Sequence, residues 1–364
     1  MSKKNKKNID KNIDKNIDKK NEEKTELLRE FERQIREKER LIADYRNEHG
    51  KLELFFKRMI DVVPKIPKTQ KLYFPKRSRG TPITAVMHIS DGHMGAVQVA
   101  DEIEGINEFN PNICRDRQIR YAERLVDWVT MHRASYNIKQ CAVIVTGDLI
   151  SGDIHDELRI TNAFPVPVQI IRAAEILSSQ ITIIAPHFES VEIHFISEDN
   201  HARLTSKPQA KEAGYNSYNY LVGFIAKLFL EKQDNVLFSL YPKYEQIVNI
   251  NSRQYLICHG HGIRGWMGIP WYSIERKVAK ESTARMQIIM NDVKRSVAIG
   301  FHRYVFGHWH VPFEHPLYLC CGSVSGTDAY DHKSGRYAPP SQSSWMVHPR
   351  YGEFNRINFD LRFV

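Results

Sequence analysis

The sequence contains few cysteines, and none of the five lies in a C-x-x-C arrangement. Three of them lie within or next to apolar segments. Cysteines placed in this way are typical of reduced thiols packed in the interior of an intracellular protein. We therefore expect a cytoplasmic protein.

Long hydrophobic runs are also missing. The longest, YLVGFIAKLFL at 220–230, is short and contains Lys227. A transmembrane helix needs about 20 predominantly apolar residues. A secretory signal peptide needs an apolar stretch after its basic start, and the Lys-rich start of this chain has none. We predict no signal peptide and no membrane association.

Acidic residues are clearly outnumbered by basic ones only at the start of the chain. The net charge is +9, but residues 1–80 alone carry 24 Lys and Arg against 14 Asp and Glu, whereas the other 284 carry 28 against 29. The basic character therefore belongs to the N-terminal segment. A length of 364 residues with 42% hydrophobic content suffices for one large catalytic domain at 83–364 plus an appendage.

The appendage has two parts before its linker. Residues 1–21 form a Lys/Asn-rich, low-complexity tail built on a K-N-I-D repeat, which has too little apolar bulk to fold alone. Residues 22–63 show the 3-4 apolar spacing of a coiled-coil helix, which Pro64 ends. We predict that this helix forms a homo-oligomer, most simply a dimer. The alternative is an amphipathic helix folded back on the catalytic domain.

A basic linker at 64–82 joins the helix to the rest of the chain. Between Lys65 and Arg79 it holds six basic residues and no acid. Such a segment can lie along phosphates and strengthen nucleic-acid binding in a salt-dependent manner. It can equally be a solvated spacer, so nucleic acid is a candidate partner only.

Metal-ligating residues follow apolar, β-branched segments at five places in the remaining sequence. They are Asp91 and His93 after AVMHIS, Asp148 after CAVIVTG, Asn200 after VEIHFISED, His259 after QYLIC, and His308 and His310 after RYVFG. In α/β folds, functional loops gather at the carboxyl ends of strands. Carboxylate, amide and imidazole ligands together suit a pair of divalent transition-metal ions.

The order D-x-H, G-D, N-H, H and G-H-x-H resembles the calcineurin-like metallophosphoesterase superfamily over about Thr84 to Pro312. The resemblance implies an α/β fold, a four-layer α-β-β-α sandwich with two mixed sheets, here preceded by the N-terminal coiled-coil helix. The GDIHDEL stretch and the Gly-, Ser- and Pro-rich segment after the last motif are similar to phage-encoded members. A phage protein would act in the host cytoplasm.

The resemblance also implies a role for each motif residue. Asp91, His93 and His310 would hold one metal ion. Asn200, His259 and His308 would hold the second, and Asp148 would bridge both. A hydroxide shared by the two ions, Mn with Fe or Zn as alternatives, would attack phosphorus. His201 would stabilise the leaving oxygen.

Three positions depart from the family pattern. The third motif of the family usually begins with Gly, whereas here it reads Glu198-Asp199-Asn200-His201, and Ser151 and Ala202 stand where many relatives carry acids. His201 thus lacks its usual carboxylate partner, for which Asp153, His155 and Asp156 are the nearby candidates. Of the two histidines in CHGHG we prefer His259 over His261 as the ligand, because His259 directly ends the apolar segment.

The substrate is less constrained than the metal site. Arg203 and Lys207 are candidate phosphate-binding residues, because guanidinium and ammonium groups near such a centre can clamp an anion. The basic linker favours a phosphodiesterase or nuclease acting on nucleic acid, although the near-neutral catalytic part argues against a long duplex. The alternatives are a phosphomonoesterase for nucleotides or proteins, and a coiled-coil scaffold with a vestigial metal site.

Overall fold

The computed structural model describes residues 80–265, 268–291 and 300–362, together with a few positions between 33 and 69. The chain divides into two units, Met1–Pro64 and Lys65–Val364. In the first unit, the described positions 33, 35–40 and 43 are helical. The predicted tail at 1–21 and most of the coiled coil at 22–63 and of the linker lie outside the described residues, so dimerisation stays a prediction.

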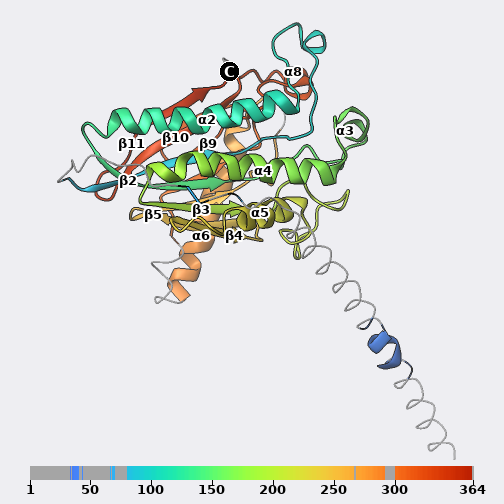
Figure 1. The fold of residues 1–364 in the computed structure, drawn as a ribbon. Helices are drawn as coiled ribbons and strands as arrows, with labels where there is room; N and C mark the ends of the chain where they lie inside the picture. Colours follow the sequence, from blue (N-terminus) through green and yellow to red (C-terminus); the bar gives the residue numbers. More distant parts are fainter. Residues whose placement is uncertain are drawn as a thin grey trace, which may run out of the picture. The chain divides into compact units, whose positions relative to one another are not determined.

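The second unit contains a six-stranded mixed sheet in the order β11-β10-β1-β2-β3-β4 (Figure 1). Its strands are β1 (Pro82–Ile89), β2 (Asn137–Val145), β3 (Ser190–Ile196), β4 (Val236–Tyr241), β10 (Ser341–His348) and β11 (Gly352–Asp360). Strands β1 to β4 run parallel, and β10 pairs antiparallel with both β1 and β11. The carboxyl ends of β1, β2 and β3 therefore lie at the same edge of this sheet.

A second, five-stranded sheet has the order β5-β6-β7-β9-β8. Its strands are β5 (Glu245–Ile250), β6 (Arg253–Cys258), β7 (Arg303–Phe306), β8 (Phe313–His315) and β9 (Tyr318–Cys320). Strands β6, β7 and β9 run parallel, while β5 and β8 pair antiparallel at the two edges. The carboxyl ends of β6 and β7 again lie side by side.

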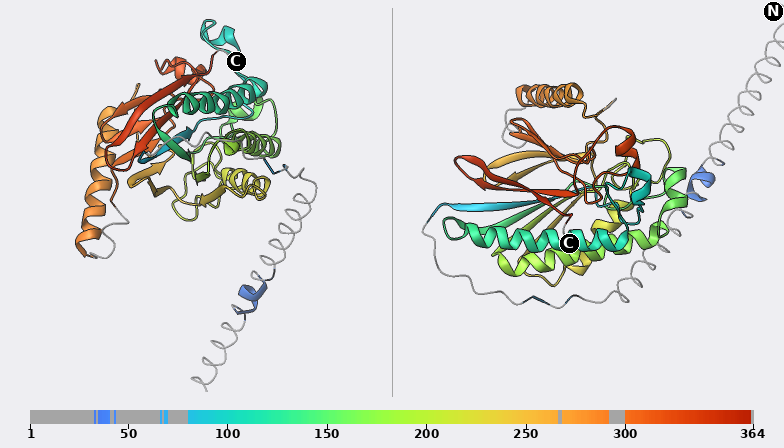
Figure 2. Two further views of the ribbon diagram at one scale, coloured as in Figure 1. Left: turned by 60° about the vertical axis from the view of Figure 1, so that its left-hand side comes forward. Right: turned by 90° about the horizontal axis from the view of Figure 1, so that it is seen from above.

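Helices cover the outer faces of both sheets, which confirms the predicted four-layer sandwich. Figure 2 shows α2 (Pro111–His132), α4 (Val166–Ile184) and α5 (Tyr218–Phe229) outside the first sheet, with α6 (Trp271–Asn291) on the opposite side of the molecule. The other helical segments are short: η1 (Ala100–Ile103), α3 (Asp156–Thr161), η2 (Ala185–His187) and α8 (Ala329–Lys333).

Local sequence explains where the long helix α2 begins. The side chain of Asn110 accepts hydrogen bonds from the backbone amides of Asn112 and Ile113, and Pro111 occupies the first turn. An Asn cap followed by Pro satisfies free amide groups and fixes φ before the first helical turn. Between β2 and α4, α3 forms one short exposed helix.

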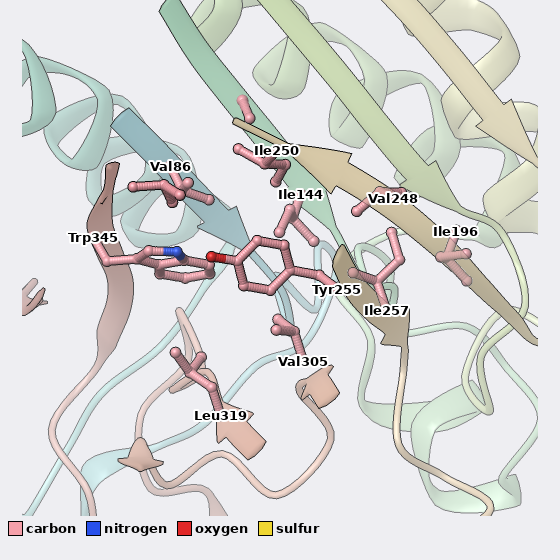
Figure 3. Close-up of a cluster of buried hydrophobic side chains, with 12 residues drawn as sticks. Val86, Ile144, Ile196, Val248, Ile250, Tyr255, Ile257, Val305, Leu319 and Trp345 are labelled. Atoms are coloured by element: carbon pink, nitrogen blue, oxygen red, sulfur yellow. The ribbon is translucent and has the colours of Figure 1, made fainter. Parts of the chain in front are cut away.

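The main core lies between the two sheets (Figure 3). Figure 3 shows Val86 and Ile144 of the first sheet facing Ile257 and Val305 of the second. Trp345 lies among them, with its ring 6.0 Å from the ring of Tyr255. Inward-facing side chains on both sheets explain why these strands are so rich in apolar residues.

One helical stretch, Val166–His187, is long and apolar enough to cross a membrane by length and composition alone. Within the structure 61% of its apolar 18-residue window is buried, because its apolar side packs on the first sheet beside α2 and α5. This is how the core helix of a globular domain behaves.

All five cysteines are buried and free, and burial raises the pKa of the Cys114 thiol to about 12.

A buried histidine in β1 predicts acid sensitivity. His88 is fully buried with its Nε2 2.9 Å from the hydroxyl of Thr146, and burial together with the charge of Arg356 lowers its pKa to about 3. The unfolded chain takes up this proton near pH 6.5, whereas the folded protein does not, so stability present above pH 6.5 is lost as the pH falls. Between pH 6.5 and pH 4, the free energy of unfolding of the wild type should fall by up to about 3 kcal/mol more than that of His88→Gln. Urea unfolding at each pH in the presence of a chelator measures this difference. If the free energies of unfolding of the two proteins changed in parallel with pH, the prediction would be wrong.

Candidate metal centre

All seven predicted ligands lie together where five parallel strands end. Asp91 and His93 follow β1, Asp148 follows β2, and Asn200 follows β3, all in the first sheet; His259 follows β6, and His308 and His310 follow β7, in the second. Hydrogen bonds join these loops both across the two sheets and within the first sheet. The backbone amide of His308 lies 3.0 Å from both carboxylate oxygens of Asp91, and the amide of Asp91 donates to the carbonyl of Gly147.

The backbone at this centre is strained. Five of the seven residues have a positive φ: Asp91 (51°), His93 (45°), Asp148 (48°), His308 (70°) and His310 (60°). Each such conformation costs a non-glycine residue on the order of 1 kcal/mol or more, and persists only where the surroundings impose it. Because the strain is concentrated on the candidate ligand residues, we infer that the fold keeps these conformations in order to direct their side chains toward the centre.

The first ligand group consists of Asp91, His93 and His310. The Nε2 atoms of His93 and His310 face each other at 3.0 Å, and the Nε2 of His310 lies 3.7 Å from Asp91 Oδ1. Two imidazole lone pairs this close need a proton or a cation between them. We call this group site A.

The second group is arranged around His259. Its Nε2 lies 2.9 Å from both the carboxylate of Asp148 and the amide oxygen of Asn200, and its ring lies 5.1 Å from that of His308. We call Asn200, His259 and His308 site B. Asp148 belongs to one ligand group with His259 and His308 and to another with His93 and His201, so its carboxylate lies between the two sites.

Electrostatics favour cations here. Burial and the neighbouring histidines lower the pKa of His93 and of His308 well below the ordinary value, so both rings offer neutral nitrogens. Burial opposes charge on His259 and His310 too, but nearby carboxylates outweigh it and raise their pKa values to about 9 and about 10. Without metal, these protons provide the positive charge. The oxygen and nitrogen donors, the facing lone pairs and the buried carboxylates together fit two divalent ions.

Residues behind the ligands hold them in place. Asp199 accepts hydrogen bonds from the amides of Asp148 and Ala202 and from the side chain of Asn219, at 2.6 to 2.8 Å. Burial, followed by the charge of Asp148, raises the pKa of Asp199 to about 8. His259 Nδ1 lies 2.9 Å from the carbonyl of Thr146. The sequence pattern assigned Asp199 no role.

His201 lies over the centre with a partner that the sequence did not indicate. Its Nδ1 is 2.7 Å from the backbone carbonyl of Ser151, which takes the place of the expected carboxylate. Asp153 and Asp156 are exposed, and the ring of His155 stands 5.9 Å from that of His201. The candidates drawn from the sequence were therefore wrong: a carbonyl orients this ring.

Gly152 allows this close approach. Its φ is +68°, and a Cβ atom there would lie 2.0 Å from the carbonyl oxygen of His201. No L side chain fits without moving the backbone of one loop or the other. The glycine thus keeps the Ser151 carbonyl under the His201 ring.

The two predicted substrate residues differ in their surroundings. Arg203 is half-buried, and its guanidinium contacts the carbonyls of Thr205 and Ser206. Burial lowers the pKa values of His155 and of His261, and the nearby charge of Arg203 contributes to both shifts. Lys207 is exposed. The ring of His261 lies 5.6 Å from that of His259, beside the ligand groups rather than within them.

No family model matches the chain, and no curated protein matches it either. Three solved structures illustrate its likenesses. A predicted phosphoesterase from Streptococcus pneumoniae is 10% identical, with a TM-score of 0.27 over 76% of this chain and 98% of its own. Vacuolar protein sorting 29 from Cryptosporidium parvum is 15% identical, with a TM-score of 0.29 over 76% and 97%. Vps29 from Entamoeba histolytica, in complex with zinc, is 12% identical, with a TM-score of 0.28 over 76% and 99%. Likeness at this level does not identify a reaction.

Proposed function

We propose that this protein is a dinuclear metal-dependent phosphoesterase of the calcineurin-like type. One observation carries the proposal: seven ligands from five strand ends converge on two groups of nitrogen and oxygen donors that share Asp148. Bound divalent ions would supply an activated water at neutral pH and positive charge opposite the phosphoryl oxygens. Mn is our expected ion, with Fe or Zn as alternatives.

The chain's own residues would position the ester and the proton donor. His201 keeps 20% of its side chain exposed and lies beside His93, with ring centroids 4.7 Å apart. With Nδ1 directed at the Ser151 carbonyl, its Nε2 is the nitrogen that would meet a leaving oxygen. Arg203, anchored at the rim, would contact the outer part of the substrate.

For the substrate class we propose a phosphodiester, with nucleic acid as the natural form. The support is the basic N-terminal segment, which would follow a phosphate backbone, and the proposed dimer through residues 22–63, which would double that contact. A phosphomonoesterase is the second candidate, because the residues after 80 have a near-neutral charge balance and would hold a small anion at the centre alone. The likeness to phage-encoded members stays a prediction.

Hydrolysis by the purified full chain loaded with Mn²⁺ tests this function. The substrates are a bis-aryl phosphodiester, an aryl phosphomonoester, and labelled single- and double-stranded DNA. We expect turnover of the diester and of DNA. Turnover of the monoester alone would assign a phosphatase, and a protein that binds two Mn²⁺ ions without hydrolysing any of the four would overturn the proposal.

A matched variant separates nucleic-acid binding from chemistry. It replaces the six basic residues between Lys65 and Arg79 by Gln. If the linker follows phosphates, DNA cleavage should weaken and lose much of its salt dependence, while hydrolysis of the small diester stays unchanged. Equal rates on DNA would show that the linker is a spacer.

A further inference from the structure

The loop between β9 and β10 places a carboxylate directly behind a site A ligand. Asp331, in α8, has its Oδ2 2.6 Å from the Nδ1 of His310. This contact is unlike that of His259 in site B, whose Nδ1 meets an uncharged backbone carbonyl. Asp331 is 1% exposed, so its charge is not screened by water.

The surroundings fix Asp331 from three sides. Its other oxygen, Oδ1, lies 2.8 Å from Nη2 of Arg336, a residue that is itself only 7% exposed. The carboxylate of Asp328 accepts the backbone amide of Asp331 at 2.8 Å and so caps α8. The backbone amide of Arg336 donates to the Asp331 carbonyl at 2.9 Å. These contacts hold α8 in place, with the Asp331 carboxylate between His310 and Arg336.

The same loop is tied to the ligand motif itself. The guanidinium of Arg336 stands 5.6 Å from the ring of Trp309, the residue between His308 and His310. At the start of the loop, Asn107 donates to the carbonyls of Ser325 and Thr327, and Gln98 accepts the amide of Ala329. The contacts that position α8 therefore also determine the orientation of His310, the second histidine of G-H-x-H.

This geometry determines which nitrogen of His310 faces the centre. When Nδ1–H donates to a carboxylate, Nε2 carries the lone pair, and the negative charge behind the ring makes that lone pair a stronger ligand. Nε2 is the atom that faces His93 at 3.0 Å. Site A thus has the carboxylate of Asp91 among its ligands and that of Asp331 behind them, whereas site B has the neutral amide of Asn200.

We propose that Asp331 is a positioning residue that fixes the ring of His310 for metal binding and makes site A the tighter of the two sites. The inference rests on the proposed function, because it assumes that the centre holds two ions. It also makes the β9–β10 loop, which the strand-end motifs do not include, part of the metal centre.

Mn²⁺ binding tests the proposal without any assay of turnover. Metal-free wild type and Asp331→Asn are titrated with Mn²⁺ by calorimetry, and electron paramagnetic resonance distinguishes single ions from coupled pairs. In Asp331→Asn we expect the tighter site to lose about 10- to 100-fold in affinity, the usual loss when such a partner is changed. Excess Mn²⁺ should restore the coupled signal.

Two further variants distinguish the effect of the Asp331–His310 hydrogen bond from that of general negative charge near His310 and from a loss of stability. Asp328→Asn is the matched control: its carboxylate lies 3.9 Å from His310 Nδ1, and an Asn still caps α8, so Mn²⁺ affinity should remain within about threefold of wild type. Asp331→Asn leaves Arg336 without its ion-pair partner, so the double variant with Arg336→Gln is measured as well. Thermal unfolding in chelator should recover in the double variant, while Mn²⁺ affinity stays low.

The outcomes distinguish this inference from the proposed function. Wild-type Mn²⁺ affinity at both sites in Asp331→Asn would overturn the role of Asp331, whatever the hydrolysis assays show. An equal loss in Asp328→Asn would also overturn it, because general charge rather than the hydrogen bond would then set the affinity. A wild type that binds two Mn²⁺ ions without hydrolysing esters would remove the proposed function and leave this inference standing.

Discussion

Replacing Asp148 by Asn should reduce kcat/KM for every ester that the wild type hydrolyses by about a thousandfold or more. The carboxylate lies between the two ligand groups, 2.9 Å from His259 and in one group with His93 and His201. The Asn side chain has the same shape, but its amide offers one neutral oxygen where the carboxylate offers two oxygens that share a negative charge. It therefore cannot bind two cations at once. A thousandfold loss corresponds to about 4 kcal/mol of transition-state stabilisation, which is what a metal ion can supply by stabilising the charge that develops on the phosphoryl oxygens.

Metal content shows whether this loss has the expected cause. We expect Asp148→Asn to bind about one Mn²⁺ ion tightly where the wild type binds two, without the coupled signal of a pair. Asp116→Asn is the matched control, because Asp116 is a partly exposed residue of α2 paired with Arg115. It should retain both ions and full activity. If Asp148→Asn kept two ions and wild-type turnover, Asp148 would not be the bridging ligand.

The candidate ligand residues could be picked out because each of them follows an apolar strand within four residues. A buried parallel strand reads as a β-branched run, and the side chains just after it lie at the functional edge of the sheet. His259 was preferred over His261 on this ground, and the structure places His259 in a candidate ligand group with His261 beside it. The pairing of two sheets came from the family resemblance, because strands as short as β8 and β9 leave almost no periodic signal.

The residues behind the ligands were not predictable in the same way. His201 is oriented by a backbone carbonyl, and every residue has one, so no side-chain pattern marks Ser151. Asp331 lies 21 residues after His310 in a loop without regular periodicity, and only the folded chain brings the two together. Asp199 was visible as the neighbour of Asn200, but its inward orientation depends on the positions of Asn219 and Asp148. These contacts join segments far apart in sequence.

Replacing His201 by Asn should lower kcat by about 10²- to 10⁴-fold, but only for esters with poor leaving groups. The ring stands at the open side of the centre, with its Nε2 4.0 Å from Asp148 Oδ2. A protonated His201 can donate from Nε2 to a departing alkoxide, which needs a proton. A nitrophenolate leaves without one, so its release should depend little on the histidine. Asn has no titratable proton to give.

A series of diesters with leaving groups of increasing pKa measures this difference. In wild type the rate should fall gently along the series, whereas in His201→Asn it should fall steeply while Mn²⁺ content remains at two ions. His155→Asn is the matched control, because its ring lies 5.9 Å from that of His201 and is not itself a member of any ligand group; it should keep the wild-type slope. Equal losses for all leaving groups in His201→Asn would mean that the ring holds the substrate in place and does not supply the proton.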